Sequence, residues 1–337
     1  MPLVSAMEAE MKIELKHGAG GAATSELISN LFAKYFSNSI LNKMEDGAVL
    51  PVLQGNVVFT SDSFVVEPLF FSGGDIGRLS ICGTVNDLAA MGAKPLYLTS
   101  SFILETGLDS KVLERIIQSM ANTAQEAGIQ IVAGDTKVVP GKGGLFINTA
   151  GIGERNKEIN ISAHNLQIGD KIILTGTMGD HHAVIMTSRL GIETKAISDC
   201  APLGKIVERL LTEKIQIHTL RDITRGGLAT VANELADASN VRINLQEEQI
   251  PVSESVKGLA GILGLDIFTM GNEGKFFVAV APRDAERALA IIRKEKYGGN
   301  AAVVGEVVEG KGVYVQNSLG SSRKLNSLQG EGLPRIC

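Results

Sequence analysis

The stretch IGRLSICGTVNDLAAMGAKPLYLTSSFIL, residues 76–104, predicts a helix that leads into a buried strand. The small residues of its first part allow a helix to pack closely, and its last part is mostly apolar. The next segment, residues 109–128, predicts a second helix, with Asp109 as its cap and Gly128 as its end. Helices alternating with strands predict a domain in which helices cover a sheet.

Strands are predicted on both sides of these two helices. They cover residues 56–64, 129–139 and 144–153. The first runs into the polar loop TSDSF, and the second runs into a loop at GDTKVV. Together these elements predict an α+β half that extends from about Asn56 to Gly153.

The second half of the chain alternates in the same way. Strands or helices are predicted within residues 165–176, 178–191, 202–214, 217–239, 274–295 and 300–316, the last as two strands joined by a Gly-containing turn. A chain of 337 residues suits two domains of ordinary size. We expect a flexible N-terminal segment (1–44), an N-terminal domain (45–155), a C-terminal α/β domain (156–316) and a mobile tail (317–337).

Composition limits the functions that are open to the chain. The formal net charge of −5 and the pI near 5.7 give no basic field for nucleic acid. The first residues do not form a signal peptide, and no apolar stretch is long enough to span a bilayer. Three widely spaced cysteines, Cys82, Cys200 and Cys337, suit a reducing compartment. These features predict a cytoplasmic protein with no membrane partner.

The chain ends in GEGLPRIC, so its last residue is a thiol. Glycine and proline in this segment argue against a terminal helix or strand, and we expect Cys337 to be mobile. From the residue alone, an accidental terminal cysteine and a functional one are equally good readings. Cys82 and Cys200 are better explained as packed thiols.

Four aspartates lie where predicted strands give way to loops or just inside a following helix. They are Asp62, Asp87, Asp135 and Asp222. Each alone is better explained as a helix cap or turn residue. Together they suit Mg²⁺ bound with the phosphates of a nucleotide, because Mg²⁺ takes only some of its oxygen ligands from protein.

Two further segments, which are rich in histidine or glycine, are candidates for a phosphate-binding loop or a metal site. HGAGG, from His17 to Gly21, would let backbone N–H groups approach phosphate oxygens, although it lacks the ending of a P-loop and also suits a mobile terminus. His181 and His182 are adjacent and so point to different sides of a helix. We expect a solvated helix start there rather than a metal site.

Six segments occur in the order and approximate spacing of one ATP-binding superfamily: HGAGG, TSDSF, GTVNDLAAMGAKP, AGDTKV, RDITRGG and GNEGK. That superfamily includes aminoimidazole ribonucleotide synthetase, selenophosphate synthetase and thiamine monophosphate kinase. The terminal residues PRIC point to one family within this superfamily. The chain resembles the HypE family of hydrogenase maturation proteins, the carbamoyl dehydratases, over about residues 12–337.

The resemblance implies a fold and a set of site residues. The fold would be two α+β domains like those of aminoimidazole ribonucleotide synthetase, with the N-terminal sheets of two subunits joined in a homodimer and ATP near that interface. The four aspartates would bind Mg²⁺, and His17, Gly18, Gly20, Gly21, Asn86, Asp87, Asp135, Thr136 and Asp222 would bind ATP. Lys137 would stabilise the transferred phosphoryl group, and Glu273 would be the general base. Without the resemblance, a surface lysine and a turn glutamate are the better readings of these two.

The resemblance also implies a reaction and partners. Cys337 would be carbamoylated by the carbamoyltransferase HypF, and the amide oxygen would be phosphorylated by ATP. Loss of phosphate would leave a thiocyanate, whose cyanide goes to an iron-carrying HypC–HypD complex for [NiFe]-hydrogenase. Two alternatives are phosphoryl transfer to an external small molecule, as in selenophosphate synthetase, and a non-enzymatic carrier that ATP controls.

Overall fold

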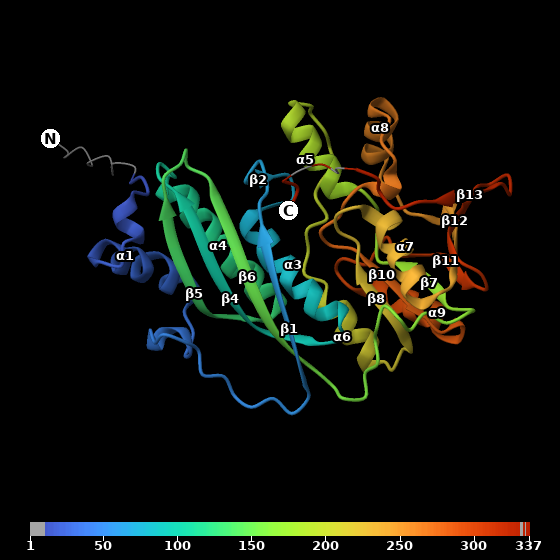
Figure 1. The fold of residues 1–337 in the computed structure, drawn as a ribbon, viewed down its shortest axis with the longest axis horizontal. Coiled ribbons are helices and arrows are strands. Elements are labelled where there is room, and N and C mark those ends of the chain that lie inside the picture. Colours follow the sequence, from blue (N-terminus) through green and yellow to red (C-terminus); the bar gives the residue numbers. More distant parts are fainter. Residues whose placement is uncertain (1–10, 331–332, 334) are drawn as a thin grey trace.

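The structure, a computed structural model, describes residues 11–330, 333 and 335–337 (Figure 1). The strands are β1 (Asn56–Phe64), β2 (Phe70–Phe71), β3 (Gly74–Asp75), β4 (Lys94–Glu105), β5 (Gln130–Val139), β6 (Leu145–Arg155), β7 (Lys171–Leu174), β8 (Ile217–Asp222), β9 (Arg242–Gln246), β10 (Phe276–Val280), β11 (Ala302–Val308), β12 (Gly312–Gln316) and β13 (Ser322–Leu325). The α-helices are α1 (Ala22–Leu27), α2 (Ala33–Phe36), α3 (Ile76–Ala90), α4 (Ser110–Ala127), α5 (Asp180–Leu190), α6 (Gly204–Thr212), α7 (Gly227–Ser239), α8 (Glu254–Leu263) and α9 (Ala285–Lys294). The predicted α+β class is confirmed.

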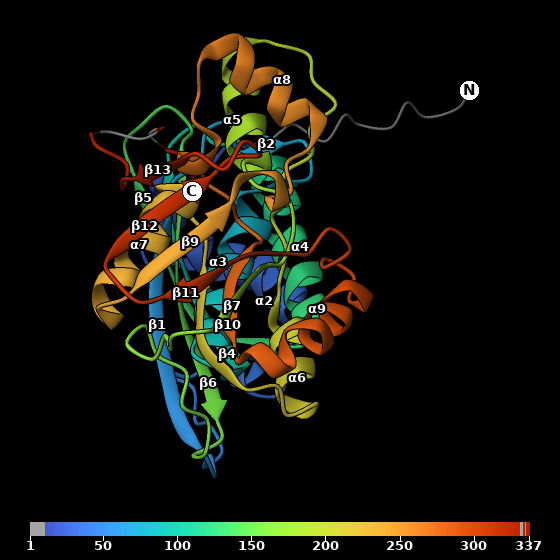
Figure 2. The ribbon, with the colours of Figure 1, turned by 90° about the vertical axis from the view of Figure 1, so that its right-hand side faces the viewer.

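The N-terminal half is built on a four-stranded sheet in the order β1-β6-β4-β5. Only β4 and β5 are parallel, because α4 carries the chain back between them. As predicted, Asp109 caps α4 by accepting from the Lys111 N–H, and Gly128 ends it in the left-handed region at φ 74°. Helices α3 and α4 pack on one face of this sheet (Figures 1 and 2).

The C-terminal half contains a seven-stranded sheet in the order β13-β12-β9-β11-β7-β10-β8. Apolar side chains of α7 pack on one face, and those of α6 and α9 pack on the other. The two strands predicted at residues 300–316 are present, but they do not form a hairpin. Strand β9 lies between them and is parallel to β12, which the spacing along the chain did not indicate.

Helix α3 joins the two halves. Its last turn, Ala89 and Ala90, is buried in the core of the C-terminal half. Near its first turn, Arg78 donates to the Cys200 carbonyl oxygen at 2.8 Å and pairs with Glu126 at 2.9 Å. The small residues of α3, which were predicted to allow close packing, therefore let the C-terminal half approach the backbone of this helix.

The segment before β1 differs from the expected flexible start. Residues 1–10 lie outside the described residues, but residues 22–36 form α1, a π-helical turn η2 (Ile28–Phe32) and α2. Leu27, Leu31, Phe32 and Phe36 are buried against the N-terminal core. Their helical spacing gives this segment an apolar face that anchors it on the sheet.

The C-terminal segment also differs from the expected mobile tail. Residues 322–325 add β13 to the edge of the large sheet, where Leu325 is buried. At the end of the chain Ile336 is only 4% exposed and packs in the N-terminal core, with Cys337 beside it. The terminus is docked because apolar burial and hydrogen bonds offset the conformational entropy that this Gly- and Pro-rich segment loses.

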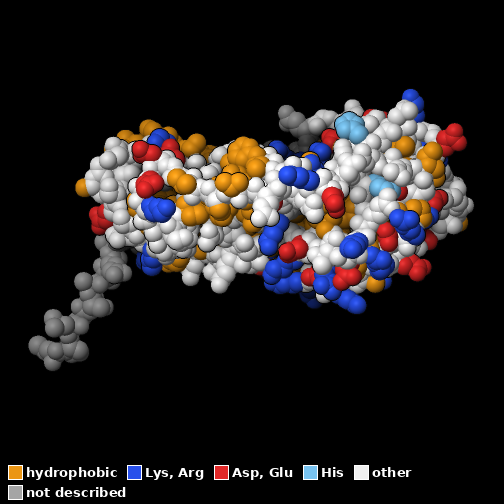
Figure 3. Space-filling model, turned by 90° about the horizontal axis from the view of Figure 1, so that it is seen from below, with side chains coloured by type: hydrophobic (Ala, Val, Ile, Leu, Met, Phe, Trp, Pro, Cys, Tyr) orange, Lys and Arg blue, Asp and Glu red, His pale blue; other side chains and the backbone are white. Residues whose placement is uncertain are grey.

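One face of the four-stranded sheet carries exposed apolar side chains. Val57 and Phe59 on β1 and Ile103 on β4 are 62%, 67% and 48% exposed. Seen from below, apolar side chains gather over the half of the molecule that holds this sheet, and charged ones over the other half (Figure 3). Among the described residues, no helix has the length and apolar character needed to cross a bilayer.

Candidate active site

Three of the four predicted aspartates come together where the two halves meet. Asp62 lies on β1, Asp87 on the last turns of α3 and Asp222 at the end of β8. Asp87 accepts a hydrogen bond from Thr60 Oγ1 at 2.9 Å, which fixes its carboxylate toward β1. Asp87 and Asp222 line one cleft together with Thr224 and Arg225. Asp62 lies close enough for its charge to raise the pKa of Asp87.

The grouping of acids disfavours their charged forms. The pKa of Asp87 is raised to about 6, first by burial and then by the charge of Asp222, with a smaller contribution from Asp62. Burial also raises the pKa values of Asp62 and Asp222. A divalent cation would relieve this repulsion, so the chemistry of the cluster fits Mg²⁺.

Asp135 does not join the other three acids. Along β5 side chains alternate, and Asp135 pairs in register with Ser101, whereas Asp62 lies in the neighbouring row with Thr149. Because Thr149 contacts Thr84 of α3, Asp62 lies on the helix-covered face and Asp135 on the open face. In the described part of the chain, no three His, Cys, Asp or Glu side chains are placed to hold a metal ion by themselves. The predicted set of four is therefore not assembled within one chain.

Lys137 lies on the same open face as Asp135. Its Nζ is 3.1 Å from Asp135 Oδ1, and both side chains are exposed. This contact is the main cause of the lowered pKa of Asp135. Lys137, which is predicted to stabilise the transferred phosphoryl group, thus lies on the opposite side of the sheet from Asp62.

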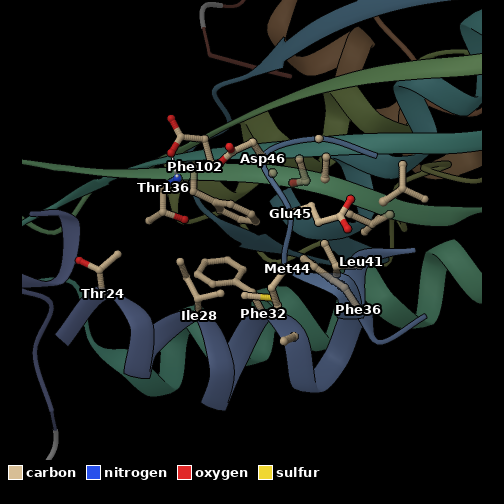
Figure 4. A pocket seen from close by; sticks show the side chains of 18 of the residues that line it. Thr24, Ile28, Phe32, Phe36, Leu41, Met44, Glu45, Asp46, Phe102 and Thr136 are labelled. Atoms are coloured by element: carbon tan, nitrogen blue, oxygen red, sulfur yellow. Dashed lines mark hydrogen bonds between the residues drawn. The ribbon is translucent and has the colours of Figure 1, made fainter. Parts of the chain in front are cut away.

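A cavity of about 330 Å³ lies between the N-terminal helical segment and strands β4 and β5. Ile28, Phe32 and Phe36 point from the helices toward Phe102 and Thr136 on the strands (Figure 4). Asp135 and Lys137 also line it. An apolar cavity that opens on a few polar groups suits a flat, mostly apolar ring with a charged extension.

The Gly-rich segment borders this cavity. Gly18 and Gly20 line it, and a Cβ on Gly18 would lie 2.5 Å from the Val138 backbone nitrogen. Glycine is therefore required for this loop to lie against β5. Gly21 is the N-cap residue of α1.

His17 and Asn86 both take part in local structure. His17 is buried, and its Nδ1 accepts from the Glu14 N–H at 2.9 Å. Asn86 is also buried, and its amide bonds the Ala201 carbonyl and the Leu203 N–H at 3.0 and 2.8 Å. The contact of these two residues with a nucleotide stays a prediction.

Cys337 and Glu273 form the second centre of the site. Glu273 is buried, and the Cys337 thiol lies close enough to its carboxyl group for each to shift the pKa of the other. Burial, followed by the charges of Asp199, Asp222 and Asp62, raises the pKa of Glu273 well above its usual value. Burial and then the Glu273 charge raise the pKa of the Cys337 thiol. The thiol is therefore docked in its neutral form.

Residues missed by sequence reasoning hold Glu273 in place. The Asp199 carboxylate accepts from the backbone N–H groups of Glu273 and Gly274 at 3.3 and 3.1 Å. Lys275 Nζ lies 3.4 Å from the same carboxylate, and both side chains are buried. Asp199 lies far from GNEGK in sequence and belongs to no quoted motif, so only the packed structure reveals this pair.

The interpretation of His181 as part of a solvated helix start is wrong. His181 is fully buried, with Nδ1 2.8 Å from Ser198 Oγ and Nε2 2.8 Å from the Ile336 carbonyl oxygen. The ring also lies edge-on to Phe71, with centroids 5.2 Å apart. The helix faces the docked tail, a contact that local sequence does not indicate.

Comparisons with known proteins identify the family of this fold. The profile of AIR synthase related protein, N-terminal domain, matches residues 44–155, and that of the C-terminal domain matches residues 167–317. The chain is 44% identical over 335 residues to carbamoyl dehydratase HypE of Escherichia coli K12, covering 96% of this chain and 99% of that protein. The chain belongs to the HypE family.

Solved structures of HypE proteins share the fold. A solved structure of HypE in complex with ATP superposes on this chain with a TM-score of 0.92 and 44% sequence identity, covering 96% of this chain and 99% of that one. HypE in a HypE–HypF complex has a TM-score of 0.79 and 44% identity, covering 91% and 100%. These comparisons confirm the predicted family and its two-domain fold. They also confirm that the family is one of carbamoyl dehydratases.

We predict that Asp87→Asn stabilises the ligand-free chain while it weakens Mg·ATP binding. The pKa of Asp87 in the folded chain, about 6, lies above its ordinary value of 3.8, so its charged form destabilises the fold at pH 8. Asparagine should raise the free energy of unfolding by about 1–3 kcal/mol at pH 8, and this gain should shrink as the pH falls through 6 toward 4. Urea unfolding at pH 8 and pH 5 measures it.

The same variant should lose Mg·ATP affinity by on the order of 10- to 100-fold, measured by calorimetry at pH 8. Asp237→Asn on the exposed side of α7 is the matched control and should change neither quantity. A stability gain that is equal at both pH values, or an unchanged affinity, would remove Asp87 from the site.

Proposed function

We propose that the chain dehydrates a thiocarboxamide carried on Cys337 to a thiocyanate, at the expense of ATP. The contact between the Cys337 thiol and the buried Glu273 carboxyl group is the observation that carries this proposal. It places the end of the chain against an acid–base group inside the fold. A group attached to the sulfur would then reach Glu273 without a separate binding step.

The cavity beside the Gly-rich segment is suited to the nucleotide. Its apolar part, with Ile28, Phe32 and Phe102, would hold the base, and the backbone near Gly18 and Gly20 would face the phosphates. A solved complex of ATP with a HypE protein that is 44% identical to this chain supports this assignment.

Asp62, Asp87 and Asp222 would hold Mg²⁺ together with the phosphates. The raised pKa of Asp87 supports the assignment, because a cation is what such a cluster lacks. We further propose that the site is shared between two copies, since Asp135 and Lys137 lie on the open face of the sheet. The exposed Val57, Phe59 and Ile103 on that face support pairing of two N-terminal sheets.

ATP supplies the phosphoryl group that makes the amide oxygen of the thiocarboxamide a leaving group. When that oxygen attacks the γ-phosphorus of ATP, ADP leaves and one N–H proton passes to solvent. Glu273 then accepts the second N–H proton, the nitrogen electron pair completes the C≡N bond, and the C–O bond breaks as phosphate leaves. The Cys337 sulfur retains the carbon throughout, so the product is a thiocyanate.

The surroundings of Glu273 suit a base in such a step. Its raised pKa makes the carboxylate a stronger proton acceptor than a solvated glutamate. The Asp199 carboxylate holds its backbone, and the Lys275 cation offsets that charge. Burial excludes water, which would otherwise hydrolyse the activated group.

The remaining steps involve partners. A HypE–HypF complex has been solved for a relative with 44% identity, and we propose HypF as the carbamoyltransferase that loads Cys337. An iron-carrying HypC–HypD complex would accept the cyanide. All three cysteines are free, which suits the cytoplasm as the site of this chemistry.

We predict that Glu273→Gln binds ATP normally but accumulates the carbamoylated form of Cys337. Glutamine keeps the backbone contacts with Asp199 and cannot accept the proton, so dehydration should slow by about 10²–10⁴-fold. Mass spectrometry of the loaded chain after ATP addition measures this rate. Glu254→Gln on the exposed side of α8 is the control. Dehydration at the wild-type rate in Glu273→Gln would exclude Glu273 as the base, and an absence of any dehydration in the wild type would favour a carrier.

We predict that Phe59→Lys converts a dimer to a monomer. Phe59 is 67% exposed on the open face, and a lysine there would place a charge in the apolar contact between two sheets. Light scattering at micromolar concentration measures the mass. Ile262→Lys on α8, where the side chain is 83% exposed, should remain dimeric. A wild-type monomer would contradict the pairing.

A further inference from the structure

Side chains of α5 hold the last two backbone carbonyl groups before Cys337. His181 Nε2 lies 2.8 Å from the Ile336 carbonyl oxygen, and Arg189 donates to the Arg335 carbonyl oxygen at 2.5 Å. Arg189 also donates to the Glu67 carbonyl oxygen, and Arg335 pairs with the Glu67 carboxylate at 2.7 Å. The tail is therefore held by its backbone, directly before the reacting residue, and Figure 1 shows α5 beside this end of the chain.

The hydrogen-bond network determines which ring nitrogen of His181 carries the proton. Ser198 Oγ accepts from the Cys200 N–H at 3.2 Å, so its own proton is available for His181 Nδ1 at 2.8 Å. The ring proton then lies on Nε2 and is donated to the Ile336 carbonyl oxygen. Burial lowers the pKa of His181 and keeps the ring neutral, so both nitrogens are used in this one arrangement.

The start of α5 and the position of Glu273 are set by adjacent residues. The Asn272 side chain accepts from the Gly179 N–H at 2.7 Å and donates to the Ile223 carbonyl oxygen at 3.0 Å. Gly179 directly precedes α5, and Glu273 follows Asn272 in the chain. The buried Asn272 side chain thus fixes His181, which holds the tail, relative to Glu273, whose carboxyl group lies beside Cys337.

We propose that His181 is a positioning residue that docks the last peptide of the tail, so that the group carried by Cys337 lies against Glu273. The proposal rests on the proposed function for its catalytic consequence, but the docking itself does not depend on it. The same contact keeps Cys337 only partly exposed and restricts its access to any enzyme that loads it. Loss of the His181 donor should therefore have opposite effects on two steps: loading becomes no slower, and dehydration becomes slower.

The first test measures docking alone, with neither ATP nor partner. The wild type and His181→Leu are treated with iodoacetamide, and peptide mass spectrometry follows labelling at each cysteine. Leucine fills part of the ring's volume and cannot donate, so labelling of Cys337 should become about three- to tenfold faster. His181→Gln retains an N–H donor and should label Cys337 near the wild-type rate. His164→Gln, at an exposed histidine, is the matched control.

The labelling pattern separates docking from general loosening of the fold. Cys82 and Cys200 are buried and should stay unlabelled in His181→Leu. Faster labelling of all three cysteines, or a Cys337 rate equal to that of the wild type, would overturn the proposal. If His181→Leu does not fold, Ser198→Ala keeps the histidine but removes the partner of Nδ1, and it should also speed the labelling of Cys337 alone. An unchanged rate in that variant would count against the proposal.

The second test uses the full reaction. With the carbamoylating enzyme, carbamoyl phosphate and ATP, His181→Leu should be loaded at least as fast as the wild type. It should then dehydrate about tenfold or more slowly, while its ATP affinity is unchanged. Loading and dehydration slowed together would indicate a merely structural role for His181. A wild type that labels as expected but never dehydrates would refute the proposed function and leave the docking role intact.

Discussion

A buried carboxyl group among other carboxyl groups is the constraint on which the active-site region depends. Glu273 lies inside the fold near Asp199, Asp222 and Asp62, and burial together with these charges disfavours its ionised form. The surrounding structure compensates locally. Lys275 offsets the charge of Asp199, Asp199 binds the backbone of Glu273, and the nearby Cys337 thiol partly lowers the pKa of Glu273. The end of the chain thereby forms part of the surroundings of Glu273.

This constraint also explains why two halves of the chain must meet so closely. Asp62 and Asp87 come from the N-terminal sheet and α3, whereas Asp222 and Glu273 come from the C-terminal half. Helix α3 packs in both cores, and Arg78 and Asn86 tie it to the segment around Cys200 to Leu203. A loss of packing between the halves would therefore change the charges that surround the reacting atoms as well as the stability.

Local patterns predicted most of the fold. The cap at Asp109 and the end of α4 at Gly128 follow from residue type and spacing, and the structure shows them as expected. The strand predicted from Asn56 is present, but it continues through TSDSF to Phe64, where a loop was expected. The grouping of Asp62, Asp87 and Asp222 followed from motifs in a recognised order. What failed depends on contacts between distant segments. The face on which Asp135 lies is set by register, β9 separates β11 from β12, and His181 meets a tail 155 residues further along the chain. Gly- and Pro-rich sequence at the terminus could not show that Ile336 is buried.

The central claim is that Cys337 carries the substrate and that the fold removes water from it. The most direct measurement is site-resolved mass spectrometry of the intact chain, incubated with the carbamoylating enzyme, carbamoyl phosphate and ATP. Our account predicts a carbamoyl adduct on Cys337 that converts, with further ATP, to an adduct lighter by one water, and neither should form in Cys337→Ala. An adduct on Cys82 or Cys200, or a Cys337 adduct that never loses water in the presence of ATP, would contradict it.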